Sequence, residues 1–298
     1  MRYNFPEDTK MKISEILKQN KKTISYEVFP PKTDSSFESV RAATEEIASL
    51  LPAFMSVTYG AGGGTSQYTL EIAKNIESCY KIPTLAHLTC VSSTKKTVRQ
   101  RIAELSTAGI QNIMALRGDI PKDSENMPRD YRYAVELVRE IRDTGVDFCI
   151  GGACYPEIHP ESVSREDDLI HLREKVDAGL DFLTTQMFFD NSLYYKFLEN
   201  AEKHGIFLPI IPGVMPITGV KQVERAISLS NSYMPKEFLA LVEKYGSDPV
   251  AMKQAGIEYA IGQMTDLYEN GVKNIHVYTM NKPDVAEYIL RSLSSILS

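Results

Sequence analysis

One carboxylate interrupts an apolar segment near the start of the chain. Glu27 lies within Thr23–Phe29, where the alternation of a strand places it on the same face as Ser25. A carboxyl group removed from water holds its proton more tightly, which suits a general acid near neutral pH. A structural ion pair is the alternative role, because a buried charge is costly without a partner. We interpret Glu27 as a candidate general acid.

Further polar residues stand at or just beyond the ends of other apolar segments. Histidine can transfer a proton or bind a metal, and a glutamine amide offers both a donor and an acceptor to a heterocycle. The glycine-rich residues 60–64 lack the lysine of a nucleotide P-loop, so they form either a ligand loop or a plain turn. The candidates are Thr58, His87, Arg117, Asp119, Tyr155, His159, Gln186 and Tyr278.

The elements that position these residues alternate regularly along the chain. Apolar, β-branched segments are followed by helical patterns, which is typical of parallel strands joined by helices. The expected strands are Thr23–Phe29, Phe54–Tyr59, Ile82–Cys90, Asn112–Arg117, Phe148–Tyr155, Asp181–Phe189, Leu208–Val214 and Asn274–Met280. The expected helices between and after them are Phe37–Leu50, Gln67–Ser78, Thr94–Ala108, Tyr131–Thr144, Arg165–Ala178, Ser192–His204, Val220–Ser230 and Asp284–Leu297.

This alternation predicts an α/β fold, a (β/α)8 TIM barrel, whose chemistry takes place at the carboxyl ends of its strands. The polar candidates would then share one site. A doubly wound open sheet is the alternative, but Phe29-Pro30-Pro31-Lys32 stands where that fold needs a glycine loop. The stretch Val220–Gly271 is longer than one crossover helix, so we expect extra helices between strands seven and eight.

Two regions are expected. Residues 1–22 form an N-terminal lead with a short helix at Lys12–Gln19, and residues 23–298 form a single catalytic barrel. The net charge of -6 argues against nucleic acid as the main partner. No apolar run approaches the ~20 residues of a membrane span, and the first residues lack a signal core. We therefore expect a cytoplasmic protein, with its four cysteines reduced and structural.

Other chemistries are less well supported by the residues. No lysine lies within expected strands six or seven, which disfavours a Schiff-base aldolase. Glu27, His87, Asp119 and His159 could instead converge on a metal, and the sequence alone does not decide between the two kinds of site. The residues Asp168, His171 and Lys175 recur at helical spacing and either meet a ribose or phosphate or form a solvated face.

Taken in order, the motifs resemble those of the methylenetetrahydrofolate reductase family over nearly the whole chain, from about Ile13 onwards. The match is to its bacterial catalytic barrel, without the regulatory domain of eukaryotic relatives. Each motif alone is weak, but the ordered set is specific. The motifs are Tyr26–Pro31, Val57–Gly63, Ala86–Cys90, Leu116–Asp119, Tyr155–Glu161, Lys175–Gly179, Thr185–Asp190, Ile210–Ile217 and His276–Asn281.

The resemblance implies FAD-dependent reduction of 5,10-methylenetetrahydrofolate to 5-methyltetrahydrofolate by ping-pong hydride transfer through flavin N5. Glu27 would be the general acid at N10 of the folate, and Asp119 would stabilise the resulting cation and tune the flavin. NADH or NADPH is the implied electron donor. Implied cofactor-binding residues are Thr58, Tyr59, Ala61, His87, Leu116, Arg117, Gly118, Asp119, Tyr155, His159, Asp168, His171 and Lys175. Implied substrate-binding residues are Glu27, Asp119, Gln186, Gln222, Tyr278 and Lys282.

Some positions depart from the family pattern. Lys282 stands where the family often has an arginine, and it keeps the charge without the bidentate fork. Glu174 replaces an arginine that some relatives place near the FAD phosphates, and His171 replaces an asparagine. The resemblance also implies a homo-oligomer. The alternatives are a metal-dependent barrel lyase or hydrolase, a reductase fed by a partner subunit, and a non-catalytic subunit, which the presence of Glu27 and Asp119 disfavours.

Overall fold

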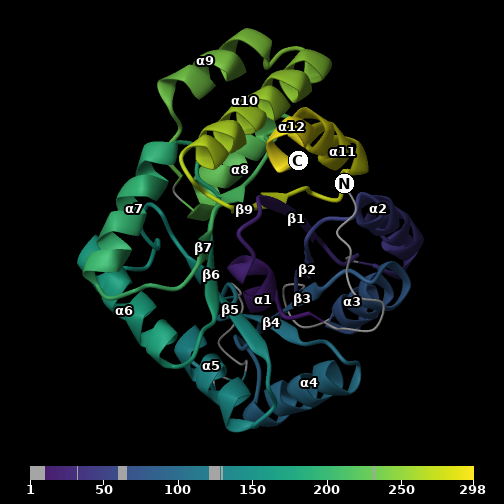
Figure 1. Ribbon diagram of the computed structural model, residues 1–298, viewed down its shortest axis with the longest axis vertical. Helices are drawn as coiled ribbons and strands as arrows, with labels where there is room; N and C mark the ends of the chain where they lie inside the picture. The colour runs from purple at the N-terminus through teal and green to yellow at the C-terminus, as the bar shows by residue number, and fades with distance from the viewer. Residues whose placement is uncertain (1–10, 32, 60–65, 121–127, 129, 231) are drawn as a thin grey trace.

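A single parallel sheet forms the centre of the molecule. The computed structural model describes residues 11–31, 33–59, 66–120, 128, 130–230 and 232–298 (Figure 1). In this part of the chain the strands run in the order β7-β6-β5-β4-β3-β2-β1-β9-β8, and each pairing is parallel. Their bounds are β1 Thr23–Val28, β2 Met55–Val57, β3 Thr84–Thr89, β4 Asn112–Leu116, β5 Cys149–Cys154, β6 Phe182–Thr185, β7 Ile210–Ile211, β8 Gly213–Val214 and β9 Asn274–Tyr278.

The sheet closes around Pro212, which separates β7 from β8. β7 pairs with β6 and β8 pairs with β9, so this one segment joins the two ends of the sheet. Proline lacks the N–H of a ladder bond, but the Pro212 carbonyl accepts a 3.0 Å bond from the His276 N–H. The predicted (β/α)8 barrel is confirmed. The single strand predicted at Leu208–Val214 was wrong in one respect, because Pro212 divides it into two short ladders.

Helices surround the ring of strands (Figure 1). The extra helices expected before the last strand are present as α9 and α10. Among the described residues, no helix has the length and apolar character needed to cross a membrane. The helical elements are α1 Ile13–Lys18, the 3-10 turn η1 Asp34–Ser36, α2 Phe37–Ser49, α3 Ser66–Tyr80, α4 Lys95–Thr107, α5 Ala134–Asp143, α6 Arg165–Asp177, α7 Asn191–Lys203, α8 Val220–Ser230, α9 Lys236–Tyr245, α10 Pro249–Glu269, α11 Pro283–Ser292 and α12 Ser294–Leu297.

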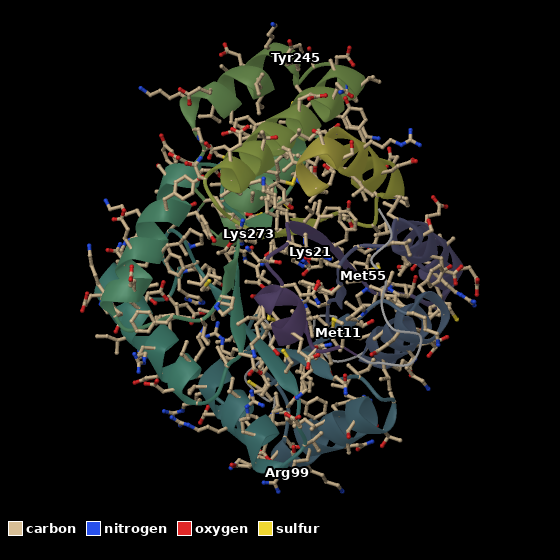
Figure 2. All side chains as sticks on the ribbon, viewed as in Figure 1. Met11, Lys21, Met55, Arg99, Tyr245 and Lys273 are labelled. Carbon is tan, nitrogen blue, oxygen red and sulfur yellow. The ribbon has the colours of Figure 1, made fainter. Side chains whose placement is uncertain are left out.

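Strand alternation separates two environments in the barrel. On β1, Ile24, Tyr26 and Val28 belong to the apolar layer between the strands and the helices. The Tyr26 hydroxyl donates to the carbonyl of Ala286 on α11 at 3.1 Å. Ser25 and Glu27 point the other way, into the barrel, as the sequence predicts. Figure 2 shows the interior of the ring filled with side chains, as a packed barrel requires.

The short helix α1 closes the amino-terminal end of the barrel and lies within the ring of strands in Figure 1. Its Ile13 and Ile16 are buried against inward-facing apolar residues, including Phe54 and Phe182. The Ile13 N–H donates to the Asn112 side-chain oxygen at 2.8 Å, which ties the helix to β4. One end of the barrel is therefore plugged and apolar, and the carboxyl ends of the strands remain for a site.

A close backbone approach fixes α10 against the segment that follows β8. A Cβ atom added at Gly256 would lie 1.6 Å from the Ile217 carbonyl oxygen. Only glycine permits this approach, because any side chain would collide with backbone. At Gly262, in the same helix, an added Cβ would meet nothing within 4 Å. The packing of α10 therefore requires glycine at position 256, whereas position 262 has room for a side chain.

We expect Gly256→Ala to lower the free energy of unfolding by about 1–3 kcal/mol, which is the typical cost of overpacking. Gly262→Ala should stabilise it by about 0.5–1 kcal/mol, because alanine loses less backbone entropy in a helix. Thermal unfolding of both variants beside the parent protein measures the two effects. Equal shifts in the same direction would contradict the close packing of α10 on Ile217.

Candidate active site

A cavity of about 410 Å³ opens where the strands end. This volume falls within the range of small-molecule pockets. Its lining comes from β1, β3, β4, β5, β6 and β9, from the segments that follow strands including β2, and from the helices α5 and α6. The barrel therefore brings together side chains that are distant in sequence. The predicted site residues that line the cavity are Glu27, Thr58, Tyr59, His87, Leu116, Arg117, Gly118, Asp119, Tyr155, His159, Lys175, Gln186 and Tyr278.

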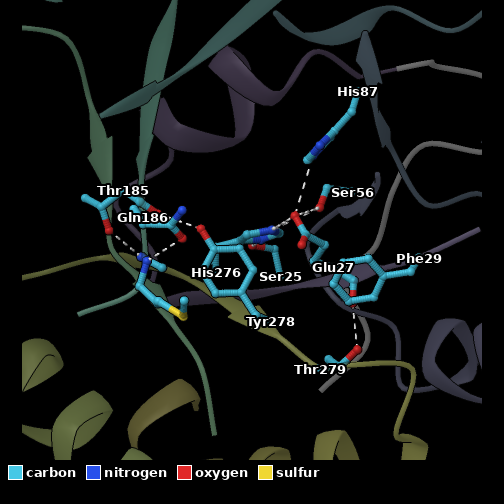
Figure 3. A network of polar contacts seen from close by, with 12 residues as sticks. Ser25, Glu27, Phe29, Ser56, His87, Thr185, Gln186, His276, Tyr278 and Thr279 are labelled. Carbon is cyan, nitrogen blue, oxygen red and sulfur yellow. Dashed lines mark hydrogen bonds and ion pairs between the residues drawn. The ribbon is translucent and has the colours of Figure 1, made fainter. Parts of the chain in front are cut away.

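A buried polar network holds Glu27 in the barrel interior (Figure 3). The Ser56 hydroxyl lies 3.3 Å from Glu27 Oε2 and 3.0 Å from His276 Nε2. The Ser25 hydroxyl lies 2.8 Å from His276 Nδ1 and 3.2 Å from the Ile275 carbonyl oxygen. A buried carboxylate needs such partners, because desolvation without hydrogen bonds is costly. The network therefore fixes the position of the Glu27 carboxyl group.

The position of the proton on His276 decides what Ser56 can do. A hydroxyl has one proton, so Ser56 donates either to Glu27 or to His276 Nε2. A proton on Nε2 makes His276 the donor to Ser56 and leaves the Ser56 proton for Glu27. The His276 ring is stacked on Phe54, with centroids 5.6 Å apart and planes at 9°. This stacking holds the His276 ring where its two nitrogens contact Ser25 and Ser56.

Sequence reasoning missed His276, Ser56 and the role of Ser25. The signal was present in the alternation of the last strand, which places His276 on the same inward face as Tyr278. Ser56 is the inward residue of β2 and is opposite Glu27 in the register of the two strands. Polar residues at inward positions of neighbouring strands could therefore have identified the partners of Glu27 from the sequence.

His87 approaches Glu27 from β3, with its Nε2 3.6 Å from Glu27 Oε2. Burial lowers the pKa of His87 to about 4, although the Glu27 charge opposes this shift and His276 adds to it. The ring is therefore neutral near pH 7, and the contact is not an ion pair. His87 Nε2 is buried and makes no hydrogen bond with the described residues. It is available to a ligand in the cavity.

Tyr278 crosses the barrel interior to β6. Its hydroxyl donates to the Thr185 carbonyl oxygen at 2.6 Å. Burial, together with the charge of Glu27, raises the pKa of Tyr278 well above its usual value, so the hydroxyl keeps its proton. Gly213 makes room for the ring, since a Cβ there would lie 2.5 Å from the Tyr278 hydroxyl oxygen. Gln186 follows Thr185, and its side-chain oxygen accepts from the Met187 N–H at 3.0 Å.

The end of β4 presents charge at the rim of the cavity. Arg117 makes a two-point ion pair with Glu161, with N–O distances of 2.5 and 2.6 Å. The pairing raises the pKa of Arg117 and lowers that of Glu161. Gly118 turns the chain with a φ of 87°, and a Cβ there would lie 2.7 Å from Val91 Cγ1. Asp119 follows and is exposed.

The segment after β5 is held by its own side chains. Tyr155 and His159 pack edge to face, with centroids 4.7 Å apart, and burial lowers the pKa of His159. Asp168 accepts from the His159 N–H at 3.0 Å, so it fixes this loop and is not among the cavity-lining residues. Lys175 donates to the Ala153 carbonyl oxygen at 2.7 Å. Burial lowers the pKa of Lys175.

Several predicted site residues lie away from the cavity lining. His171 is exposed on α6, 3.3 Å from the Glu174 carboxylate, and it stacks on Tyr133 with centroids 6.4 Å apart. Gln222 and Lys282 instead meet at Thr218. The Gln222 side-chain oxygen accepts from the Thr218 N–H at 2.7 Å, and the Lys282 ammonium donates to the Thr218 hydroxyl. Ala61 is outside the described residues.

The metal-site alternative finds no donor set in the described ranges. No three side chains of His, Cys, Asp or Glu within them are grouped so as to hold a metal ion. Glu27 and His87 do meet, but His159 is packed on Tyr155 and Asp119 lies beyond Gly118 on the exposed rim. The four residues that the sequence left open for a metal therefore divide between two parts of the site.

Solved structures with a similar backbone confirm the barrel architecture. An uncharacterized protein from Clostridium thermocellum, described as binding two copies of 5-methyl-5,6,7,8-tetrahydrofolic acid, aligns with a TM-score of 0.64 at 15% identity and covers 96% of this chain and 100% of that chain. A dihydropteroate synthase of Xanthomonas albilineans aligns with a TM-score of 0.53 at 12% identity, over 94% of each chain. At such low identity the likeness concerns the fold alone.

Sequence comparison identifies the family. The family model described as methylenetetrahydrofolate reductase matches residues 12–294. A 5,10-methylenetetrahydrofolate reductase of Pectobacterium carotovorum is 34% identical over 275 residues, which is 92% of this chain and 91% of that protein. Methylenetetrahydrofolate reductase (NADH) 1 of Arabidopsis thaliana is 34% identical over 96% of this chain, which spans 50% of the plant protein. The barrel whose cavity surrounds Glu27 therefore belongs to the methylenetetrahydrofolate reductase family of oxidoreductases.

Proposed function

We propose that the protein reduces 5,10-methylenetetrahydrofolate to 5-methyltetrahydrofolate, with FAD as its redox cofactor and Glu27 as its general acid. The observation that carries the proposal is the Glu27 carboxyl, buried in the cavity and held by Ser56 beside a neutral His87. Bacterial relatives named 5,10-methylenetetrahydrofolate reductase, which match over more than nine-tenths of both lengths, support the choice of substrate.

The cavity is suited to a polar heterocyclic cofactor. Two buried atoms at its wall, His87 Nε2 and Thr184 Oγ1, make no hydrogen bond with the described residues. Such atoms favour a ligand that supplies hydrogen-bonding groups. The cations Arg117 and Lys175 line the same cavity and suit a diphosphate.

FAD would be held by the cofactor-binding residues that the resemblance implies and that line this cavity. Asp168 would assist them, because it orders the loop that carries His159. The chemistry that FAD supplies when bound is hydride transfer between a nicotinamide donor and the folate. NADH is the donor we favour, because plant relatives are named for it.

Glu27 would protonate N10 of the folate. Protonation makes this nitrogen a better leaving group, so the five-membered ring opens and a 5-iminium cation forms at N5. Acid catalysis of this kind needs a positioned carboxyl group, and the bond from Ser56 keeps Glu27 in place. Because the acid lies inside the barrel, bulk water cannot easily take its proton.

Other side chains would orient the folate and stabilise its charge. The Asp119 carboxylate, at the rim of the cavity, would attract the cation electrostatically. The Gln186 amide suits the donor and acceptor edge of a pterin. Tyr278 is a further proposed folate contact inside the cavity. Gln222 and Lys282 meet at Thr218 outside the cavity lining, where we propose that they contact the glutamate tail of the folate. Lys282 would meet the glutamate tail as a point charge, since it lacks the bidentate geometry of arginine.

An anaerobic absorption experiment tests the function directly. The purified protein should show flavin bands that bleach with NADH and return when 5,10-methylenetetrahydrofolate is added. Bands that resist NADH, bleach with dithionite and return with the folate would point to electrons from a partner subunit. A protein that takes up no FAD would contradict the proposal.

Glu27→Gln should abolish reoxidation of the flavin by the folate and leave its reduction by NADH nearly unchanged. Glutamine keeps the shape of the side chain but cannot donate a carboxyl proton, so only the half-reaction that needs N10 protonation is affected. Stopped-flow absorbance separates the two half-reactions. Equal loss of both would show that Glu27 maintains the site and does not serve as its acid.

His87 should make the folded state sensitive to mild acid. Its pKa in the folded protein is about 4, whereas histidine in an unfolded chain titrates near 6.5. Between these values only the unfolded chain binds the proton, so the free energy of unfolding falls as the pH falls, by roughly 3 kcal/mol in all. Urea unfolding at several pH values should show a smaller loss in His87→Gln. Parallel pH profiles would refute the shifted pKa.

A further inference from the structure

We propose that Glu161 competes with the diphosphate of the cofactor for Arg117 and thereby sets the affinity of the diphosphate subsite. This inference rests on the proposed use of FAD. In the structure, the Glu161 carboxylate occupies the guanidinium edge that a phosphate would need. Binding of the diphosphate then requires Glu161 to leave.

The hydrogen bonds of Arg117 occupy three of the five N–H donors of its guanidinium group, including the pair at its outer edge. Nη1 and Nη2 donate to the two oxygens of Glu161, at 2.5 and 2.6 Å. Nε donates to the Gly118 carbonyl oxygen at 3.2 Å. Arginine binds phosphates through paired N–H groups of this kind. A phosphate can bind the outer Nη1–Nη2 edge through two N–H groups only by replacing the carboxylate.

The two partners differ in their freedom to move. The Arg117 side chain is 19% exposed and lines the cavity from the end of β4. The Glu161 side chain is 56% exposed and is not among the cavity-lining residues. The backbone N–H of Glu161 donates to His159 Nδ1 at 3.1 Å, which holds the loop itself. The Glu161 side chain can therefore rotate into water while Arg117 and the loop stay in place.

Charged side chains near Arg117 have partners of their own. Lys175, which also lines the cavity, donates one of its three N–H groups to the Ala153 carbonyl oxygen and keeps two for a phosphate. Asp168 is engaged by the His159 N–H and Ser162. A diphosphate placed on Arg117 beside an unmoved Glu161 would bring like charges into contact, which is unfavourable at a partly buried site. Exchange of one anion for the other avoids this repulsion.

The test compares flavin binding to apoprotein from the parent and from Glu161→Gln. Glutamine keeps the side-chain shape and removes the charge. We expect FAD to bind about three- to tenfold more tightly to the variant at low ionic strength, with a smaller gain at high salt. Riboflavin, which has no phosphate, should bind both proteins equally. Isothermal titration calorimetry measures all of these affinities without relying on catalysis.

Two further variants isolate the cause. Glu287→Gln removes a half-exposed carboxylate that pairs with Arg291 on α11, and it should leave FAD affinity unchanged. In an Arg117→Gln background, Glu161→Gln should no longer tighten FAD binding, because the contested guanidinium group is absent. The thermal midpoint of each apoprotein confirms that it is folded.

The outcomes are separable. Unchanged or weaker FAD binding by Glu161→Gln would overturn the competition and leave the proposed function standing. An equal gain for riboflavin would also overturn it, because the effect would not concern phosphate. Failure of the parent protein to bind FAD at all would reject the proposed function and this inference with it.

Discussion

The structure depends on keeping a carboxylate inside a closed barrel. Glu27 lies on the first strand with its side chain in the interior, where an unpartnered charge would be costly. Ser56 meets it directly, and His276 connects Ser56 to Ser25. These polar residues occupy the inward positions of three adjacent strands, β2, β1 and β9. The helix α1 then seals the other end with apolar side chains, so polar groups and apolar groups divide the barrel along its axis.

Closure of the barrel and construction of the site use the same residues. The sheet closes where Pro212 separates β7 from β8, and the next residue, Gly213, leaves room for the Tyr278 ring. Tyr278 bonds to the Thr185 carbonyl oxygen, while the Thr185 hydroxyl accepts from the Gly213 N–H at 2.9 Å. Three strand ends are thus joined beside Glu27. A change that loosens the closure of the barrel would therefore also move the Tyr278 ring beside Glu27.

Strand ends were predictable from the sequence because parallel strands are continuous apolar runs with a polar residue where each one ends. This pattern located Glu27, His87 and Gln186 at one cavity. Alternation also contained enough information to find His276. Pairings across the fold were not predictable, since nothing local joins Arg117 to Glu161 or Lys282 to Thr218. Helical spacing grouped His171 with Lys175, but the spacing does not reveal which side of α6 faces the barrel, and His171 is exposed.

The surroundings of Glu27 and those of Arg117 stabilise charge in different ways. Around Glu27 the partners are buried hydroxyls and imidazoles, whose positions are fixed and which added salt barely reaches. Around Arg117 the partner is a half-exposed carboxylate, which a competing anion would replace under the proposed exchange. Proton transfer benefits from the fixed, dry arrangement, whereas reversible binding of a charged ligand benefits from the exchangeable one. Under the proposed competition, the affinity for a charged ligand can therefore change through residues such as Glu161 without disturbing Glu27.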